Sequence, residues 1–243
     1  MTGATYVRYE LLRSIRNKRN LILTLGFPVI LYLAIASSNR HVSFDGTSFP
    51  LYFMTAMGAL GTMAAVLTSG AALATERQVG WTRQMRITPL TTRAYFGSKV
   101  LTGYLRALFT LVVLIVAGTL LGVRLSAGSW AELVGLMIVG LVPFVILGIV
   151  LGHVLAADSV GPSIGGIVSL FSLLGGAYGF ELAKSGPLFQ IMKALPSYWL
   201  VQAGKTALGG GAWPAEGWIV VALWSAALLP LAVFAYRRDT SRV

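Results

Sequence analysis

The stretch ERQVGWTRQMRITPLTTRAYFGSK, residues 76–99, decides the fold, because it is the longest polar run between two long apolar runs. It holds a single acid, Glu76, and five of the nineteen basic residues of the chain. Those basic residues are Arg77, Arg83, Arg86, Arg93 and Lys99. Basic residues gather in the short segments that join membrane-spanning helices on the cytoplasmic side. The stretch therefore predicts a polar connection between two membrane spans.

The composition supports a membrane protein. The chain has 243 residues, of which 56% are hydrophobic and only 11% are charged. An average soluble domain carries about 25% charged residues, and a soluble protein this apolar could not cover its surface. Several apolar runs reach the roughly 18 to 20 residues that cross a bilayer. We expect an all-α integral membrane protein, with residues 1–243 forming one transmembrane domain.

The net charge of +11 does not indicate nucleic-acid binding, because the basic residues lie at the ends of the apolar segments. In a membrane protein this placement sets the orientation. The chain has no cysteine, which excludes disulfides and thiolate metal sites. The two histidines, His41 and His153, share no local motif, and we predict no metal site.

Six transmembrane helices are predicted. Residues 1–20 precede them as an interfacial helix, because Val7, Leu11 and Ile15 recur every four residues. A basic tail that only sets the topology is the alternative. Pro28 predicts a kink in the first span, and Pro143 lies near the middle of the fourth. The spans are expected at about residues 21–38, 50–75, 100–121, 131–156, 163–182 and 218–236.

Two connections between these spans are distinctive. A very short inner turn with Asp158 and Gly161-Pro162 is expected between the fourth and fifth spans. Residues 183–216 are too apolar for an exposed loop, and Pro196 is among the residues that divide them into pieces too short to span. Broken backbone at membrane depth must be buried in protein or line a cavity. We therefore predict a re-entrant helical pair in the outer leaflet.

The basic residues orient the spans. With both termini cytoplasmic, the inner segments carry thirteen basic residues and the outer loops carry five. The positive-inside rule favours this orientation. Within the cytoplasmic segment, residues 83–87 suit a short helix, and the residue before Pro89 avoids helical geometry. We interpret residues 76–99 as a coupling segment for a partner protein. The alternative is a loop that only obeys the charge rule.

A family resemblance follows from these motifs. Glu76-Arg77-x-x-Gly80, then Thr88-Pro89-Leu90, then Gly97-Ser98-Lys99 entering a span, resemble the signature of type-2 ABC exporter permeases of the daunorubicin-resistance type. The resemblance covers nearly the whole chain, including Gly175-Gly176 in the fifth span and Leu195-Pro196-Ser197-Tyr198-Trp199 in the outer loop. The chain departs from the pattern at two positions. Trp81 stands where the family usually has Thr, and Arg86 where it often has Leu.

The resemblance implies a half-transporter of the bacterial cell (inner) membrane. Such permeases pair as homodimers or heterodimers and bind two copies of a cytoplasmic ATPase, which holds the ATP and Mg. The chain has no G-x-x-x-x-G-K-[ST] phosphate loop. We therefore expect no cofactor, no catalytic residue and no enzyme activity in this chain itself. The expected ATPase-coupling residues are Glu76, Gly80, Arg83, Arg86, Thr88 and Pro89.

The resemblance also assigns the substrate pathway to spans two and five, which are rich in small residues here. Packing is the alternative role for each pathway candidate. The candidates are Met54, Met57, Met63, Phe171, Leu174, Tyr178 and Glu181. The spans carry few charges, so the expected cargo is hydrophobic or amphiphilic, such as a drug, an antibiotic or a lipid, and the expected activity is efflux with multidrug or antibiotic resistance. A secondary transporter or channel, and a non-transporting resistance or sensor subunit bound to an ATPase, are the alternatives.

Overall fold

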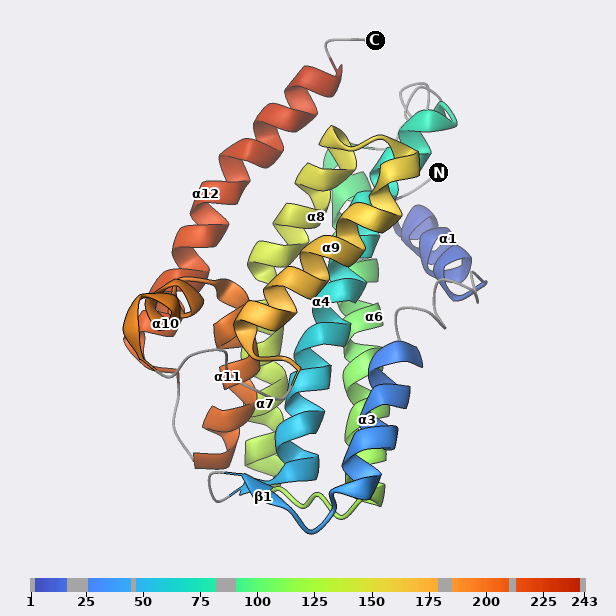
Figure 1. The fold of residues 1–243 in the computed structure, drawn as a ribbon. Coiled ribbons are helices and arrows are strands. Elements are labelled where there is room, and N and C mark those ends of the chain that lie inside the picture. Colours follow the sequence, from blue (N-terminus) through green and yellow to red (C-terminus); the bar gives the residue numbers. More distant parts are fainter. Residues whose placement is uncertain are drawn as a thin grey trace.

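The computed structural model describes residues 3–16, 26–44, 47–81, 91–178, 185–209 and 213–240, and these fold almost entirely into helices (Figure 1). A short antiparallel hairpin lies in the predicted loop between the first two spans. It consists of two strands of two residues each, β1 (Ser43–Phe44) and β2 (Thr47–Ser48). The helices are α1 (Gly3–Arg16), α3 (Phe27–Ser38), α4 (Phe49–Gln78), α6 (Thr92–Leu120), α7 (Ala127–Gly140), α8 (Val142–Val154), α9 (Ala157–Gly175), α10 (Gly186–Lys193), α11 (Pro196–Gly209) and α12 (Ala215–Thr240).

Helix α4 is the centre of the bundle, and α3, α6, α8, α9 and α11 all pack against it. Its small residues allow these neighbours to approach closely. A Cβ on Gly70 would lie 2.5 Å from the carbonyl carbon of Gly148, so the backbones of α4 and α8 are in contact. A Cβ on Gly204 of α11 would lie 2.2 Å from the Cβ of Thr55. Glycine is required at both crossings.

The all-α membrane architecture is confirmed. Among the described residues, five helices are long and apolar enough to cross a membrane: α4, α6, α7 together with α8, α9 and α12. The first predicted span is represented by α3, whose twelve described residues are too few to cross alone. The count of six spans therefore stays a prediction.

Two predicted boundaries are wrong. The expected turn at residues 158–162 is helical, because α9 begins at Ala157 and includes Pro162. This proline removes only one backbone bond, near the exposed start of the helix. The same helix ends at Gly175, before residue 182, because Gly176 takes a left-handed conformation with φ of 79°.

Other boundaries show smaller differences. The fourth span is divided at Leu141 into α7 and α8, and Pro143 stands in the first turn of α8, where an amide hydrogen has no helical partner. Helix α6 begins two turns before the predicted residue 100. The side chain of Thr91 accepts a hydrogen bond from the Ala94 amide at 3.3 Å and caps this earlier start.

The apolar segment 183–216 contains two short helices, as the sequence predicts. Helix α11 begins at Pro196 after a turn, and its first residues are buried. It contacts α4, α7, α9 and α12, so its broken backbone is covered by protein. The indole nitrogen of Trp199 donates to the Lys193 carbonyl at 2.7 Å, which ties α11 to α10. Re-entry into a membrane leaflet stays a prediction.

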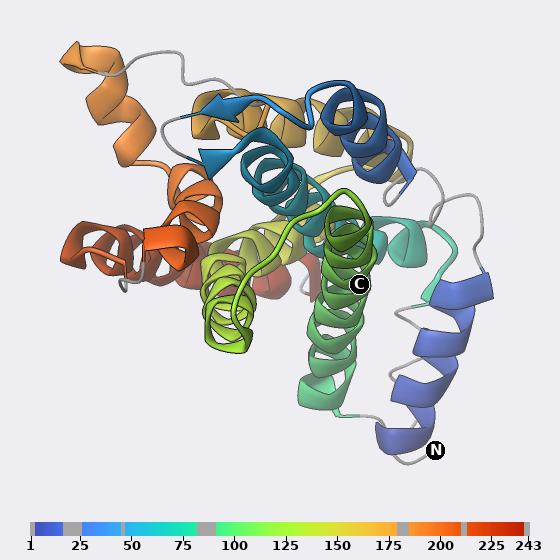
Figure 2. The same cartoon turned by 90° about the horizontal axis from the view of Figure 1, so that it is seen from below.

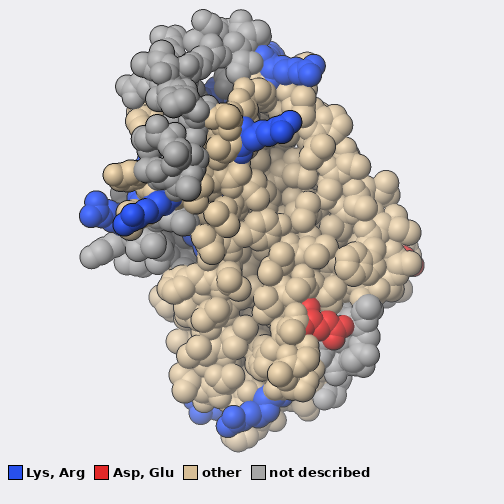
Figure 3. Space-filling view, turned by 180° about the vertical axis from the view of Figure 1, so that it is seen from behind, with Lys and Arg blue, Asp and Glu red and all other residues tan. Residues whose placement is uncertain are grey.

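Charged side chains separate from a broad uncharged middle. In Figure 3, lysine and arginine side chains lie toward the top and at the lower edge of the face shown, while most of the middle is uncharged. The upper end holds α1, the last turn of α4, the first turns of α6 and the C-terminus of α12, and we call it the basic end (Figure 1). Helix α1 lies beside α6 there, at the margin of the bundle (Figure 2).

Candidate functional site

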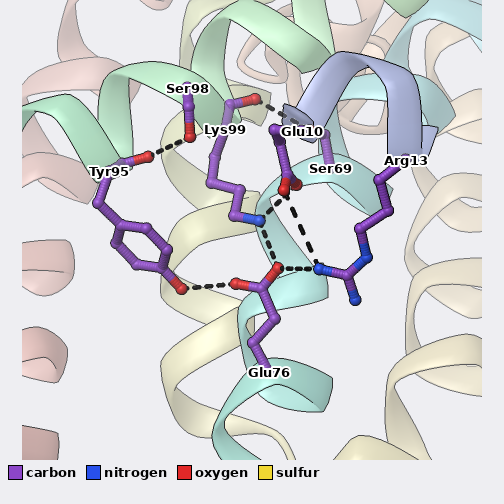
Figure 4. Close-up of polar contacts among 7 residues, drawn as sticks. All are labelled: Glu10, Arg13, Ser69, Glu76, Tyr95, Ser98 and Lys99. Atoms are coloured by element: carbon purple, nitrogen blue, oxygen red, sulfur yellow. Dashed lines mark hydrogen bonds and ion pairs between the residues drawn. The ribbon is translucent and has the colours of Figure 1, made fainter. Parts of the chain in front are cut away.

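A charge cluster with a buried centre joins three helices at the basic end, and Figure 4 shows its contacts. We define it as Glu10 and Arg13 of α1, Glu76 of α4, and Tyr95 and Lys99 of α6. Glu76 and Lys99 lie deepest, with side chains only 2% and 1% exposed. Ionised groups are almost never buried this completely unless they are paired.

Lys99 is the central cation of the cluster. Its Nζ donates to Oε1 of Glu76 and to Oε1 of Glu10, both at 2.5 Å. Its backbone is also fixed, because the Ser69 hydroxyl of α4 donates to the Lys99 carbonyl at 2.9 Å. Lys99 therefore holds α6 against both α1 and α4.

Glu76 accepts hydrogen bonds on both carboxylate oxygens. Besides Lys99, Arg13 Nη1 donates to its Oε1 at 3.1 Å, and the Tyr95 hydroxyl donates to its Oε2 at 2.6 Å. Tyr95 precedes Lys99 by four residues, so both side chains lie on one face of α6. Arg13 also lies 4.0 Å from Glu10 within α1. The interfacial helix is thus attached to the bundle through charge-assisted bonds, which are the stronger kind.

Arg77 follows Glu76 in sequence, but its side chain contacts a different helix, α8. Its Nη1 donates to the carbonyl of Gly152 at 2.9 Å and also to the carbonyl of His153. These carbonyls belong to the last turn of α8, where cationic side chains satisfy unpaired acceptors. The Glu76-Arg77 pair therefore links the end of α4 to α1 and α6 on one side and to α8 on the other.

The cluster and Arg77 together make the end of α4 a junction with α1, α6 and α8. Removing one partner from a buried ion pair leaves an uncompensated charge, which costs about 3–5 kcal/mol. A displacement of the chain just after Glu76 would therefore be passed to α1, α6 and α8 together. Residues 82–90, which follow this junction, lie outside the described residues.

Two of the predicted coupling residues fall within the described part of the chain. Glu76 contacts Arg13, a basic residue of the N-terminal helix. Gly80 has φ of 72° in the turn after α4 and nothing within 4 Å of an added Cβ, so glycine suits this turn for conformational reasons. The expected short helix and the residues Arg83, Arg86, Thr88 and Pro89 lie outside the described residues.

Sequence reasoning missed the roles of Glu10, Tyr95 and Lys99 as partners of Glu76. Glu10 carries a signal that could have been used, because it is the only acid among the first twenty residues, which hold five basic residues. For Tyr95, the signal was its spacing of four from Lys99, which becomes visible only once α6 is known to begin at Thr92.

The predicted pathway residues lie in different environments. Met54, Met57 and Met63 are buried within this single chain, with side chains at most 2% exposed, as packing residues would be. Phe171 stacks edge-to-face on Phe144 and Trp224. Leu174 is half-buried, and Tyr178 lines a cleft. Glu181, the last of the predicted pathway residues, lies outside the described residues. The pathway assignment stays a prediction.

The cleft has a volume of about 660 Å³ and runs from the charge cluster along α4 and α9. Its basic end is lined by Glu10, Arg13, Glu76 and Arg106, and its walls are mainly small or apolar residues. The remaining lining residues are Phe27, Pro28, Leu60, Ala64, Thr68, Ala72, Thr75, Ala157, Val160, Gly161, Ile164, Gly165, Val168, Ser169 and Tyr178.

Comparison with known proteins agrees with this architecture. Residues 4–207 match the family model described as "ABC-2 type transporter". The chain belongs to the ABC-2 type transporter family. It is also similar to a protein of Bacillus subtilis (strain 168) named "Putative transport permease YvfS", with 25% identity over 209 residues, which are 84% of this chain and 81% of that protein.

Membership of the ABC-2 family settles the general role. The chain is the membrane-embedded permease subunit of an ABC transporter and crosses the membrane several times. A permease domain of this kind is a transport subunit rather than a catalytic one, and the family implies an ABC ATPase as partner. The charge cluster and the cleft are accordingly features of a transport protein.

Proposed function

We propose that this ABC-2 permease is the membrane half of an ATP-driven exporter, which moves a hydrophobic or amphiphilic compound out of a bacterial cell. Both termini and the basic end face the cytoplasm, because thirteen basic residues lie on that side and five on the other. Two copies of this chain, or this chain and a second permease, pair with two ATPase subunits that hold ATP and Mg. Efflux of this kind would give resistance to a drug or an antibiotic.

The observation that carries the proposal is the charge cluster at the end of α4. Glu76 lies in the last turn of the central helix, at the start of the coupling segment, and its buried carboxylate is bonded to α1 and α6. Force from an ATPase on residues 82–90 would reach Glu76 within a few residues. From there α4 leads through the bundle and along the cleft.

The test is co-purification of the chain with the ATPase encoded beside it, together with ATP turnover of the complex. The double variant Arg83→Glu/Arg86→Glu should lose the ATPase, because four units of charge change at the proposed contact. A matched control is Arg40→Glu/Arg124→Glu, which makes the same charge change at two exposed positions in the predicted outer loops.

A third variant, Glu76→Ala, separates docking from transmission. It should keep some ATPase bound while substrate stimulation of ATP turnover falls, because the junction is broken rather than the contact. The proposal is wrong if no ATPase associates in mild detergent or in nanodiscs. It is also wrong if the control pair weakens association as much as the Arg83/Arg86 pair.

A further inference from the structure

Helix α1 is bonded to the bundle on one side and is exposed on another. The exposed side carries Arg8, Tyr9, Leu12 and Arg16, and we call these four residues the α1 surface. Arg8, Leu12 and Arg16 follow one another every four residues, so they form one line along the helix, with Tyr9 beside it. The side chains of Tyr9 and Leu12 are 62% and 45% exposed. The α1 surface therefore places exposed apolar groups between two guanidinium groups.

The two arginines of the α1 surface carry charge that nothing nearby balances. The charge cluster is neutral by itself, because its two cations face two carboxylates. Glu10 is the only acid among the first twenty residues, and its carboxylate is bonded to Lys99. Among the described side chains, neither Arg8 nor Arg16 forms an ion pair. Two positive charges therefore remain on the exposed side of α1.

Helix α1 lies at the level where the apolar surface of the bundle begins. It is bonded to Lys99 of α6, and Leu101, two residues farther along α6, is already exposed. Leu105 and Leu108 continue this exposed apolar surface on a helix that is long enough to cross a membrane. Helix α1 also lies across the long axis of the bundle, at its margin (Figure 1, Figure 2). In a bilayer this is the position of a helix at the level of the lipid head groups, parallel to the membrane plane.

We propose that the α1 surface binds anionic phospholipids of the membrane, with Arg8 and Arg16 on the head groups and Tyr9 and Leu12 between the lipids. Tyrosine is enriched at the level of the head groups. Each arginine close to an anionic membrane surface strengthens binding about fivefold, and guanidinium groups match the geometry of phosphate. This inference goes beyond the proposed function, because it concerns neither the cargo nor the ATPase.

The position of α1 favours a lipid over the ATPase as the partner of the α1 surface. The carbonyl of Lys99, the residue that bonds α1, accepts a hydrogen bond from Ser69. Ser69 lies nine residues, and so about 14 Å, before the end of α4 at Gln78. The segment proposed to receive the ATPase continues beyond that end. Because α1 is also bonded to Glu76, lipid binding at the α1 surface would hold the end of α4 at a fixed depth in the membrane.

The experiment uses the permease with its co-purified ATPase in nanodiscs of phosphatidylcholine. The chain has no cysteine, so Leu12→Cys can carry a single fluorophore. A small fraction of the lipid bears a nitroxide quencher and is either phosphatidylglycerol or phosphatidylcholine. The phosphatidylglycerol probe should be enriched at the fluorophore about fivefold or more over the phosphatidylcholine probe. A fluorophore on Leu120→Cys, at the opposite end of α6, should be quenched equally by both probes.

Matched variants assign this preference to the two arginines. Arg8→Gln/Arg16→Gln should reduce the enrichment to less than about twofold, whereas Arg8→Lys/Arg16→Lys should keep most of it because the charge remains. Arg40→Gln/Arg124→Gln removes the same charge from exposed positions in the predicted outer loops and should change nothing. High salt should also reduce the enrichment, because charges exposed to solvent are screened.

The inference is overturned if both probes quench the fluorophore at position 12 equally, or if the glutamine pair keeps the enrichment. It is also overturned if the ATPase covers the α1 surface. In that case both probes would quench weakly until the ATPase is removed, and the glutamine pair would lose the ATPase. A lost lipid preference with the ATPase still bound contradicts this inference alone. Absence of the ATPase from the wild type would instead contradict the proposed function.

Discussion

Replacing Lys99 with methionine tests whether the charge cluster holds α1 against the bundle. Methionine keeps the length of the side chain and its apolar stem, so the change removes the charge without opening a cavity. Coulomb's law with an effective dielectric constant of about 20 gives roughly 7 kcal/mol for each contact at 2.5 Å. Desolvation of the buried ions offsets much of this attraction. Experience with buried pairs puts the net loss on removing one partner at about 3–5 kcal/mol.

The loss should appear as separation of α1 from α6. Without Lys99, the carboxylates of Glu10 and Glu76 keep only Arg13 as a shared cation within the cluster. A loss of 3–5 kcal/mol shifts the ratio of docked to undocked α1 by roughly two to three and a half powers of ten. The chain has no cysteine, so single cysteines at Leu12 and Leu101, both exposed, can carry spin labels. Their distance distribution should be narrow in the wild type and broad in the variant.

Two further variants make this result specific. Lys193→Met removes the same kind of charge from an ion pair with Glu216, whose side chain is 61% exposed, and should cost no more than about 1 kcal/mol. Adding Glu10→Gln to Lys99→Met should restore part of the docking, because one unpaired carboxylate is removed. A narrow distance distribution in Lys99→Met, or equal effects of the two lysine changes, would refute the reasoning.

The remaining predictions concern single contacts and are measured by thermal unfolding of the purified protein. Tyr95→Phe should destabilise by about 1.5–3 kcal/mol, because it removes only the hydroxyl that donates to a buried carboxylate; an unchanged midpoint would contradict this contact. Arg77→Met should lower the midpoint and increase hydrogen exchange in the last turn of α8, whose carbonyls it leaves without this donor; exchange confined to α4 would count against it. Gly148→Ala should cost about 1–3 kcal/mol, because its Cβ would lie 2.9 Å from the Leu67 carbonyl oxygen, whereas Gly135→Ala should be neutral or stabilising.

The sequence predicted the helices well where length and apolarity alone determine them. The span at α4 was expected at about 50–75 and is Phe49–Gln78, and the last span was expected at about 218–236 and is Ala215–Thr240. A bilayer requires about twenty apolar residues whatever the tertiary contacts are. Helix boundaries that depend on one capping residue were less predictable. The examples are Thr91, which caps the start of α6, and Gly176, which ends α9.

The site was predicted only in part, because its partners are distant in sequence. Glu76 was recognised by its position at the end of a span. Its partner Arg13 is 63 residues away in the sequence. The periodicity of hydrophobic residues does not predict a contact between two residues so far apart. The methionines of the small-residue second span were predicted to line the substrate pathway, but α4 is covered on nearly every side of this chain, so Met57 and Met63 are buried. Burial of a whole helix depends on how many neighbours surround it, which composition does not reveal.

The Glu76-Arg77 pair shows how two adjacent residues can connect one helix to three others. Adjacent residues on a helix point about 100° apart, so two opposite charges at the end of α4 reach two different groups of neighbours. Glu76 engages α1 and α6, and Arg77 engages α8. Reversing the order of the two charges would direct a carboxylate at the carbonyls of α8 and an arginine at Lys99, so both contacts would become repulsive. The exchange Glu76→Arg/Arg77→Glu should therefore be worse than either neutralisation alone, although it leaves composition and net charge unchanged.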